Sequence, residues 1–136
     1  MNYLENKTAL VTGASSGIGY EIVKYISKFN MKIIVTARRE NNLNQLKKEV
    51  ENNSNSEVII LVKDLATPES PQEIYDFCLS NNLQVDFLVN NAGYGFTSDF
   101  DTYDLNKLDD FMNVLLNSLV KLTRLFLKDM KERKSG

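Results

Sequence analysis

The stretch Lys7-Thr8-Ala9-Leu10-Val11-Thr12-Gly13-Ala14-Ser15-Ser16-Gly17-Ile18-Gly19 decides the fold of this chain. A short apolar run ends there in a turn made of glycine and serine, and an amphipathic run over residues 20–29 follows the turn. This order predicts a β-strand, then a tight loop, then the first turns of a helix.

The residue types of the loop suit the binding of an anion. Gly13 lets the backbone leave the strand at angles that other residues avoid, Gly17 leaves room for a ligand, and Gly19 lets the helix lie close to the sheet. The hydroxyls of Ser15 and Ser16 can donate to phosphate oxygens, as can the free N–H groups at the start of the helix. The loop predicts a cradle for the diphosphate of a dinucleotide; the alternative is an ordinary strand-to-helix turn.

A second motif, Asn90-Asn91-Ala92-Gly93, follows an apolar run that begins at residue 85. Together with Thr-Gly-x-x-x-Gly-x-Gly at residues 12–19, in this order and at about this separation, it resembles the two motifs of the short-chain dehydrogenase/reductase family. The resemblance runs from about Lys7 to Gly136. It implies an α/β fold with a doubly wound parallel sheet, a Rossmann domain that binds NAD(P). We expect residues 1–136 to be the N-terminal half of that domain, truncated after the fourth strand and the following long helix, without the C-terminal catalytic part.

Strand-like and helix-like segments alternate along the chain, which is typical of a parallel sheet covered on both faces. The expected strand order is third, second, first, fourth. Strands are predicted near Thr8 to Thr12, Lys32 to Thr36, Val58 to Val62 and Phe87 to Asn90. Helices are predicted near Ile18 to Phe29, Asn41 to Asn52, Pro71 to Asn81 and Asn106 to Glu132.

The end of the second predicted strand bears on the choice of cofactor. An NAD site places a carboxylate there for the ribose hydroxyls, whereas an NADP site has room and a cation for the 2′-phosphate. Ala37 stands at the acidic position and Arg38 follows it, with a planar fork that suits phosphate. The sequence therefore favours NADP over NAD, unless Arg38 and Arg39 are solvated loop residues or pair with Glu40.

The resemblance implies further contacts with the cofactor. Asp64 would bind the amino group of the adenine and Leu65 would lie against the ring, although Asp64 is equally suited to cap the turn that follows. Asn91, Ala92 and Gly93 would line the ribose near the nicotinamide. The cofactor-binding set is completed by the residues of the loop: Gly13, Ser15, Ser16, Gly17, Ile18 and Gly19.

The catalytic groups that the resemblance implies are asparagine, serine, tyrosine and lysine. Asn117 lies at about the family's distance after residue 93 and is assigned the role of holding a water in the proton relay; Asn113 is the alternative. The other three groups are expected beyond Gly136. Two Tyr-x-x-x-Lys matches, at 20–24 and 103–107, fall at the wrong places in the order of elements, so we assign neither a catalytic role.

Composition excludes several classes of site and partner. The chain has one cysteine, which we expect to be buried in a helix, and no histidine, so a disulfide within the chain and a metal site are not expected. Residues 1–6 have neither the charged entry nor the apolar stretch of a signal peptide, and no apolar run is long enough to span a membrane, so we expect a cytoplasmic protein. Residues 121–134 are basic, but they keep an apolar stripe and suit the end of a helix, so no binding of nucleic acid is expected.

Two functions of different class follow from these observations. The first is an NADP-dependent oxidoreductase that interconverts a carbonyl and an alcohol on a small molecule by hydride transfer, of which this chain is the N-terminal part. The second is a catalytically inactive nucleotide-binding fragment or binding module. We expect these residues alone to be inactive, and the long helix to be a surface for association with a second copy.

Overall fold

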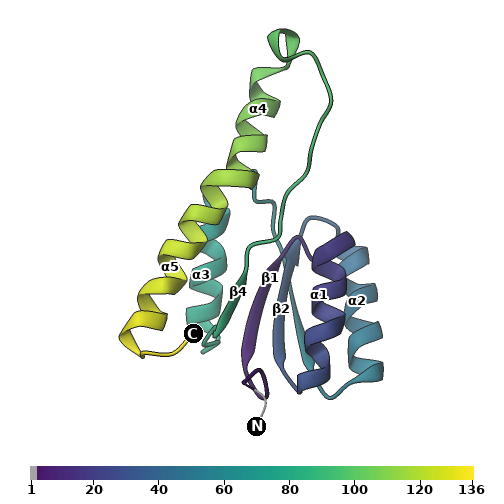
Figure 1. The fold of residues 1–136 in the computed structure, drawn as a ribbon, viewed down its shortest axis with the longest axis vertical. Helices are drawn as coiled ribbons and strands as arrows, with labels where there is room; N and C mark the ends of the chain where they lie inside the picture. The colour runs from purple at the N-terminus through teal and green to yellow at the C-terminus, as the bar shows by residue number, and fades with distance from the viewer. Residues whose placement is uncertain (1–2) are drawn as a thin grey trace.

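The computed structural model describes residues 3–136 as a four-stranded parallel sheet with helices on both faces (Figure 1). The strand order is β3-β2-β1-β4, which confirms the predicted order. The strands are β1 (Thr8–Thr12), β2 (Lys32–Ala37), β3 (Glu57–Val62) and β4 (Phe87–Val89). The helices are α1 (Gly17–Ile26), α2 (Glu40–Asn53), α3 (Ser70–Ser80), α4 (Leu105–Met112) and α5 (Ser118–Glu132). Two short 3₁₀ turns, Ser27–Phe29 and Phe100–Thr102, complete the described elements, with a π-helical segment at Asn113–Asn117.

The sheet is buried on both faces, as continuous apolar strands require. Ala9, Val11 and Ile33 point to the face that α1 and α2 cover, whereas Leu10 and Ile34 point to the face that α3 and α5 cover. All five are fully buried. The alternation along each strand therefore produces two cores, one on either side of the sheet.

The last helical region refines one prediction. The long helix expected from about Asn106 to Glu132 is present as one unbroken helical run, made of α4, a π-helical segment and α5 in succession. Within the segment the backbone N–H of Ser118 donates to the carbonyl of Asn113, a spacing of five residues. The hydroxyl of Ser118 also donates to the carbonyl of Val114 at 2.8 Å. The π turn was not predicted, because hydrophobic periodicity does not report a single widened turn within a helix.

The upper part of the molecule extends past the carboxyl ends of the strands. Figure 1 shows α4 and the loop that precedes it rising beyond the sheet. Four aromatic rings hold this loop against α4: Phe96 stacks on Tyr103 with ring centroids 4.0 Å apart, and Phe111 meets the edges of Phe96 and Tyr94. Among residues 3–136, no helix combines the length and the apolar character that crossing a membrane requires.

Cys78 illustrates the packing of the second core. It lies in α3, 1% exposed, and burial raises the pKa of its thiol to about 11. This burial agrees with the role predicted from the sequence.

We therefore expect iodoacetamide to label Cys78 slowly at pH 8 in the folded protein, because the thiolate is the reactive form. A pKa about two units above the ordinary value leaves roughly a hundredth of the usual thiolate. The labelling rate should rise about tenfold per pH unit up to about pH 11. The same chain unfolded in guanidinium chloride is the control, and equal rates in the two states would contradict the packing.

Candidate functional site

The loop between β1 and α1 is shaped by its glycines. Gly13 and Gly17 have positive φ angles of 66° and 60°, which side chains on other residues disfavour. A Cβ on Gly13 would lie 2.7 Å from the Cα of Ala92, and a Cβ on Gly19 would lie 2.6 Å from the carbonyl oxygen of Gly13. A Cβ on Gly17 would meet nothing within 4 Å. Gly13 and Gly19 thus let protein backbone pack closely, while Gly17 faces open space.

Hydrogen bonds of Thr12 connect the two sequence motifs. Its hydroxyl oxygen accepts from the backbone N–H groups of Asn91 and Ala92 at 3.0 and 2.9 Å, and the hydroxyl donates to the carbonyl of Val89 at 3.4 Å. The side-chain amide of Asn91 donates to the carbonyls of Thr12 and Gly13 at 3.0 and 3.3 Å. The ends of β1 and β4 are therefore held side by side under the loop.

An arginine covers the serine hydroxyls of the loop. Arg39 donates from Nη2 to the Oγ atoms of Ser15 and Ser16 at 3.1 and 2.5 Å, and from Nε to Ser15 at 3.3 Å. The sequence assigned the phosphate to the preceding residue, Arg38, and left Arg39 as a possible solvated side chain. The sequence could not show which of the two arginines reaches the serine hydroxyls, because both directly follow the end of β2.

These residues surround a cavity of about 290 Å³ at the carboxyl ends of the strands. Eight predicted site residues line it: Gly13, Ser15, Ser16, Arg38, Asp64, Leu65, Ala92 and Gly93. Six further residues line it: Thr36, Ala37, Arg39, Lys63, Tyr94 and Val114. Five predicted site residues are not part of its lining: Gly17, Ile18, Gly19, Asn91 and Asn117. Ile18 is 75% exposed and lies with Gly17 in a separate apolar depression on α1.

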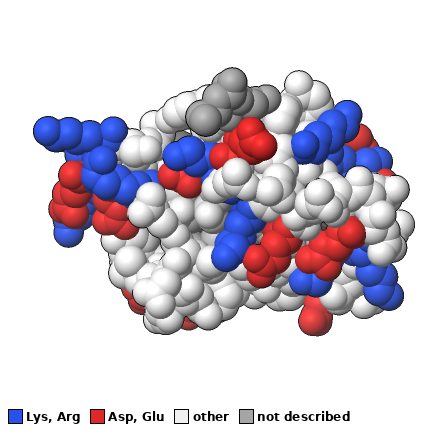
Figure 2. Space-filling view, turned by 90° about the horizontal axis from the view of Figure 1, so that it is seen from below, with Lys and Arg blue, Asp and Glu red and all other residues white. Residues whose placement is uncertain are grey.

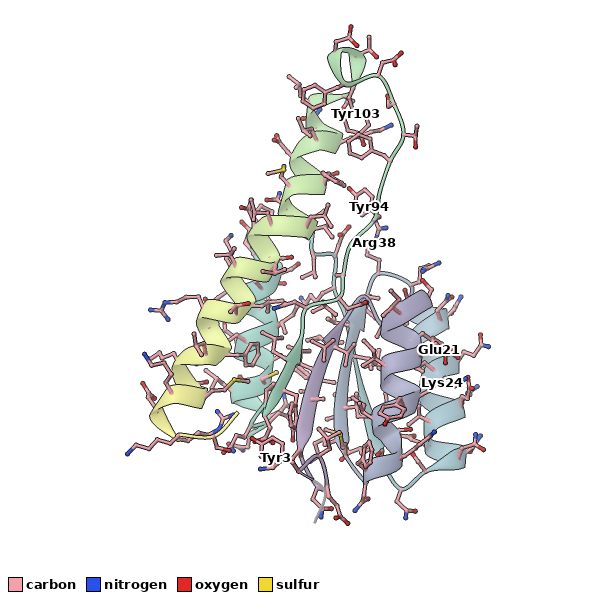
Figure 3. All side chains as sticks on the ribbon, viewed as in Figure 1. Tyr3, Glu21, Lys24, Arg38, Tyr94 and Tyr103 are labelled. Atoms are coloured by element: carbon pink, nitrogen blue, oxygen red, sulfur yellow. The ribbon has the colours of Figure 1, made fainter. Side chains whose placement is uncertain are left out.

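The charges around the cavity favour an anion. Arg38 and Arg39 line it with the carboxylate of Asp64, while Lys63, also in the lining, pairs with Glu73 at 2.6 Å. Figure 3 shows Arg38 and Tyr94 above the ends of the strands, and both belong to the lining. Burial raises the pKa of Tyr94, and the nearby tyrosine and aspartate, Tyr103 and Asp110, add to this while Arg38 opposes it. Tyr94 is therefore a neutral phenol at the mouth of a cationic cavity.

Asp64 performs the structural role that the sequence left open. Its Oδ1 accepts from the backbone N–H of Ala66 at 2.9 Å, and its carbonyl accepts from Thr67 and from the hydroxyl of Ser70 at 3.1 and 2.6 Å. The side chain caps the turn and also lines the cavity. The two roles proposed for it are compatible.

The helix presents Leu115 to the second motif. A Cβ on Gly93 would lie 2.8 Å from Cδ2 of Leu115, so these residues are in contact. Asn117, the predicted relay residue, is exposed, and its amide donates to Oδ1 of Asn113 at 2.8 Å. The catalytic role of Asn117 stays a prediction.

The tyrosine of the first Tyr-x-x-x-Lys match has a structural partner. The hydroxyl of Tyr20 donates to Glu49 at 2.6 Å, and the ammonium of Lys24 pairs with the same carboxylate at 2.8 Å. The hydrogen bond to Glu49 raises the pKa of Tyr20, the opposite of what an activated phenol requires. Lys24 lies on the outer side of α1, far from Arg38 (Figure 3). This cluster ties α1 to α2.

The second match and the basic stretch have structural contacts too. The ring of Tyr103 stacks on Phe96 near the apex of the molecule, away from the phosphate loop (Figure 3). In the basic stretch, Arg133 donates to the carbonyl of Val85 and Lys128 pairs with Glu132 at 3.9 Å. Figure 2 shows basic and acidic side chains interspersed over the face seen from below, so this face presents no extended positive surface.

A larger hollow of about 630 Å³ lies at the opposite end of the sheet, between α3 and the end of α5. It includes Cys78, whose raised pKa leaves it neutral, and Asp129, which accepts from the hydroxyl of Tyr75. No glycine loop opens onto it. In sheets of this type ligands bind at the carboxyl ends of the strands, so the smaller cavity is the candidate site. No group of three potential metal ligands occurs within residues 3–136.

Comparison with known proteins identifies the family. The protein-family model described as short chain dehydrogenase matches residues 7–136. The chain belongs to this family. Among similar short-chain dehydrogenases, a very-long-chain 3-oxoacyl-CoA reductase of Anas platyrhynchos is 35% identical over 134 residues, covering 94% of this chain and 42% of that protein. Dehydrogenase/reductase SDR family member 7 of Mus musculus is 32% identical, covering 98% of this chain and 40% of that protein.

Solved structures of short-chain dehydrogenases share the fold. L-sorbose reductase from Gluconobacter frateurii, complexed with NADPH and L-sorbose, superposes with a TM-score of 0.87 at 29% identity, covering 95% of this chain and 49% of that one. A metagenomic short-chain oxidoreductase in complex with NADP gives 0.89 at 28% identity, covering 98% and 61%. The chain thus spans about half the length of the proteins that it resembles.

Replacing Thr12 by valine should lower the free energy of unfolding by about 1–3 kcal/mol, because the partly buried N–H of Ala92 loses its acceptor and that of Asn91 keeps only the carbonyl of Val89. Thr36 is the matched control. It pairs in register with Thr12 on β2, and its hydroxyl is buried without a partner among the described residues. Thr36→Val should be neutral or stabilising. Urea unfolding of both variants measures the difference, and equal losses would contradict the role of the Thr12 hydroxyl.

Proposed function

We propose that this chain binds a nicotinamide dinucleotide, with NADP preferred to NAD, as part of an oxidoreductase that interconverts a carbonyl and an alcohol on a small molecule. The observation that carries the preference is the pair Arg38 and Arg39 at the end of β2, where Ala37 stands instead of a carboxylate. The complexes of L-sorbose reductase with NADPH and of the metagenomic oxidoreductase with NADP support it.

The described residues fit such a cofactor. The positive φ of Gly17 and the open space beside it leave the backbone accessible to a diphosphate. Ser15 and Ser16 present hydroxyls, and Arg39 lies on them ready to pair with phosphate oxygens. Asp64, with Leu65, offers a hydrogen-bond acceptor and an apolar wall for an adenine.

When bound, the cofactor supplies the hydride. The residues of this chain bind and orient it: the glycine loop takes the diphosphate, the arginines take the 2′-phosphate, and Ala92 and Gly93 let the ribose lie against the backbone. Asn117 is proposed, on the family resemblance alone, to hold a water in the proton relay. Tyr20 and Tyr103, each held by structural contacts, supply neither the acid nor the base, so we do not expect residues 1–136 alone to reduce a carbonyl.

Arg38→Ala and Arg39→Ala should each weaken NADPH binding about ten- to a hundredfold and leave NADH binding nearly unchanged. Each loses a charge-assisted contact with the 2′-phosphate, worth about 1.5–3 kcal/mol. Isothermal titration of the 136-residue chain with both cofactors measures this.

Lys28→Ala, which removes a cation in the 3₁₀ turn that follows α1, is the control and should bind both cofactors as the wild type does. Equal affinity of the wild type for NADH and NADPH would refute the preference, and loss of both cofactors in the arginine variants would assign these residues to the diphosphate instead.

We also propose that the outer face of the α4–α5 region associates with a second copy. Five apolar side chains on it are 41–54% exposed: Met112, Leu116, Leu119, Val120 and Leu127. Successive members are four, three, one and seven residues apart, so they follow one side of the helical run, beside the buried Leu122 and Phe126. A contiguous apolar patch of this kind marks an interaction surface.

Val120→Glu should reduce this association, since it places a charge in the patch without removing a core contact. Sedimentation velocity over a range of concentrations measures the change, with Asn55→Glu, which adds the same charge to an exposed loop, as the control. A wild-type chain that stays monomeric at all concentrations would refute the proposal.

A further inference from the structure

The side-chain amide of Asn113 connects two segments that are distant in the sequence. Asn113 begins the π-helical segment, and its Nδ2 donates to the carbonyl of Ala66 at 3.0 Å. Its Oδ1 accepts from Nδ2 of Asn117 at 2.8 Å. The bond from Asn117 occupies the oxygen of the Asn113 amide, so the nitrogen is the atom that faces the turn.

The turn that Asn113 contacts also holds the carboxylate of Asp64. Ala66 is held at both ends: its N–H donates to Oδ1 of Asp64, and its carbonyl accepts from Asn113. The carbonyl of Asp64 is fixed separately by Thr67 and Ser70. The hydrogen bonds of Ala66 therefore link Asn113 to the Asp64 carboxylate.

The next residue along the helix, Val114, faces the cavity. It is 8% exposed and lines the cavity together with Asp64 and Leu65. The π-helical hydrogen bond from Ser118 to the carbonyl of Asn113, with the Ser118 hydroxyl on the carbonyl of Val114, fixes the backbone of this segment. The π turn thus places Val114 in the lining of the cavity, and through Asn113 it contacts the turn that carries Asp64 and Leu65.

We propose that Asn113 is a positioning residue for the adenosine end of the cofactor: its bond to Ala66 sets the orientation of Asp64 and the separation of Leu65 from Val114. This inference rests on the proposed function of the cavity. It assigns the Asn113 amide a role in cofactor binding. From the sequence, Asn113 was considered only as the alternative to Asn117 in the proton relay.

The test uses Asn113→Leu, which keeps the approximate size of the side chain and removes the donor. We expect the affinities for NADPH and for adenosine 2′,5′-bisphosphate to fall by the same factor of about ten. Both compounds carry the adenosine that the ordered side chains of Asp64 and Leu65 would contact. Amide hydrogen exchange at Ala66 and Thr67 should become about tenfold faster.

Thr123→Val is the matched control. It removes the hydrogen bond from Asn90 Nδ2 to Thr123 at 3.0 Å, which lies on the same helical run but outside the cavity. It should change neither the affinities nor the exchange rates.

A second measurement needs no variant. Because coupling is reciprocal, saturation of the wild type with NADPH should slow exchange of the Asn113 side-chain amide and of the Ala66 amide, while the side-chain amide of Asn53 on α2 stays unchanged. Unchanged exchange at Asn113, wild-type affinity for the bisphosphate in Asn113→Leu, or an equal loss in Thr123→Val would each overturn the inference. If the wild type binds neither compound, the proposed function itself fails; if it binds both and Asn113→Leu binds them equally well, only the inference fails.

Discussion

The close approach of the ends of β1 and β4 is the constraint on which the rest of the site depends. Three hydrogen bonds to the Thr12 hydroxyl and two from the Asn91 amide close this edge of the sheet. The approach leaves no space for a side chain at Gly13, whose absent Cβ would sit 2.7 Å from the Cα of Ala92. The loop can then face open space and present its backbone N–H groups to an anion, with Arg39 held beside them by the serine hydroxyls, because the backbone polar groups beneath the loop are already paired.

The π-helical segment is the second constraint, and it acts from the other side of the cavity. The wider turn at Asn113–Asn117 places Val114 against the cavity and Leu115 against Gly93. Beyond it, α4 continues past the sheet, where the stacked rings of Phe96 and Tyr103 hold the preceding loop. Insertions of this kind in helices are frequent at functional sites, where they redirect a few side chains without ending the helix.

Electrostatics separates the candidate site from the other features of the chain. Two arginines that form no ion pair with a carboxylate among the described residues line the cavity at the carboxyl ends of the strands, whereas Lys24 on α1, Lys128 on α5 and the cavity's own Lys63 pair with glutamates. The tyrosines differ in the same way: Tyr20 is fixed by a carboxylate that raises its pKa, and Tyr94 lies beside Arg38 in the cavity. A tyrosine–lysine spacing alone does not distinguish these surroundings, because one helical turn brings such pairs together anywhere on a surface.

The sequence by itself determined the glycine loop and the succession of strands and helices, since these follow from backbone sterics and from short apolar runs between turn residues. The parallel sheet and its strand order were expected from the fold that the two family motifs imply. Only the tertiary structure decided that Arg39 lies on Ser15 and Ser16, that the long helix contains a π turn, and that Asn113 reaches Ala66, 47 residues back. The contacts of Arg39 and Asn113 join segments that periodicity treats separately. Their partners become neighbours only after the strands have paired, so the local pattern carries no record of them.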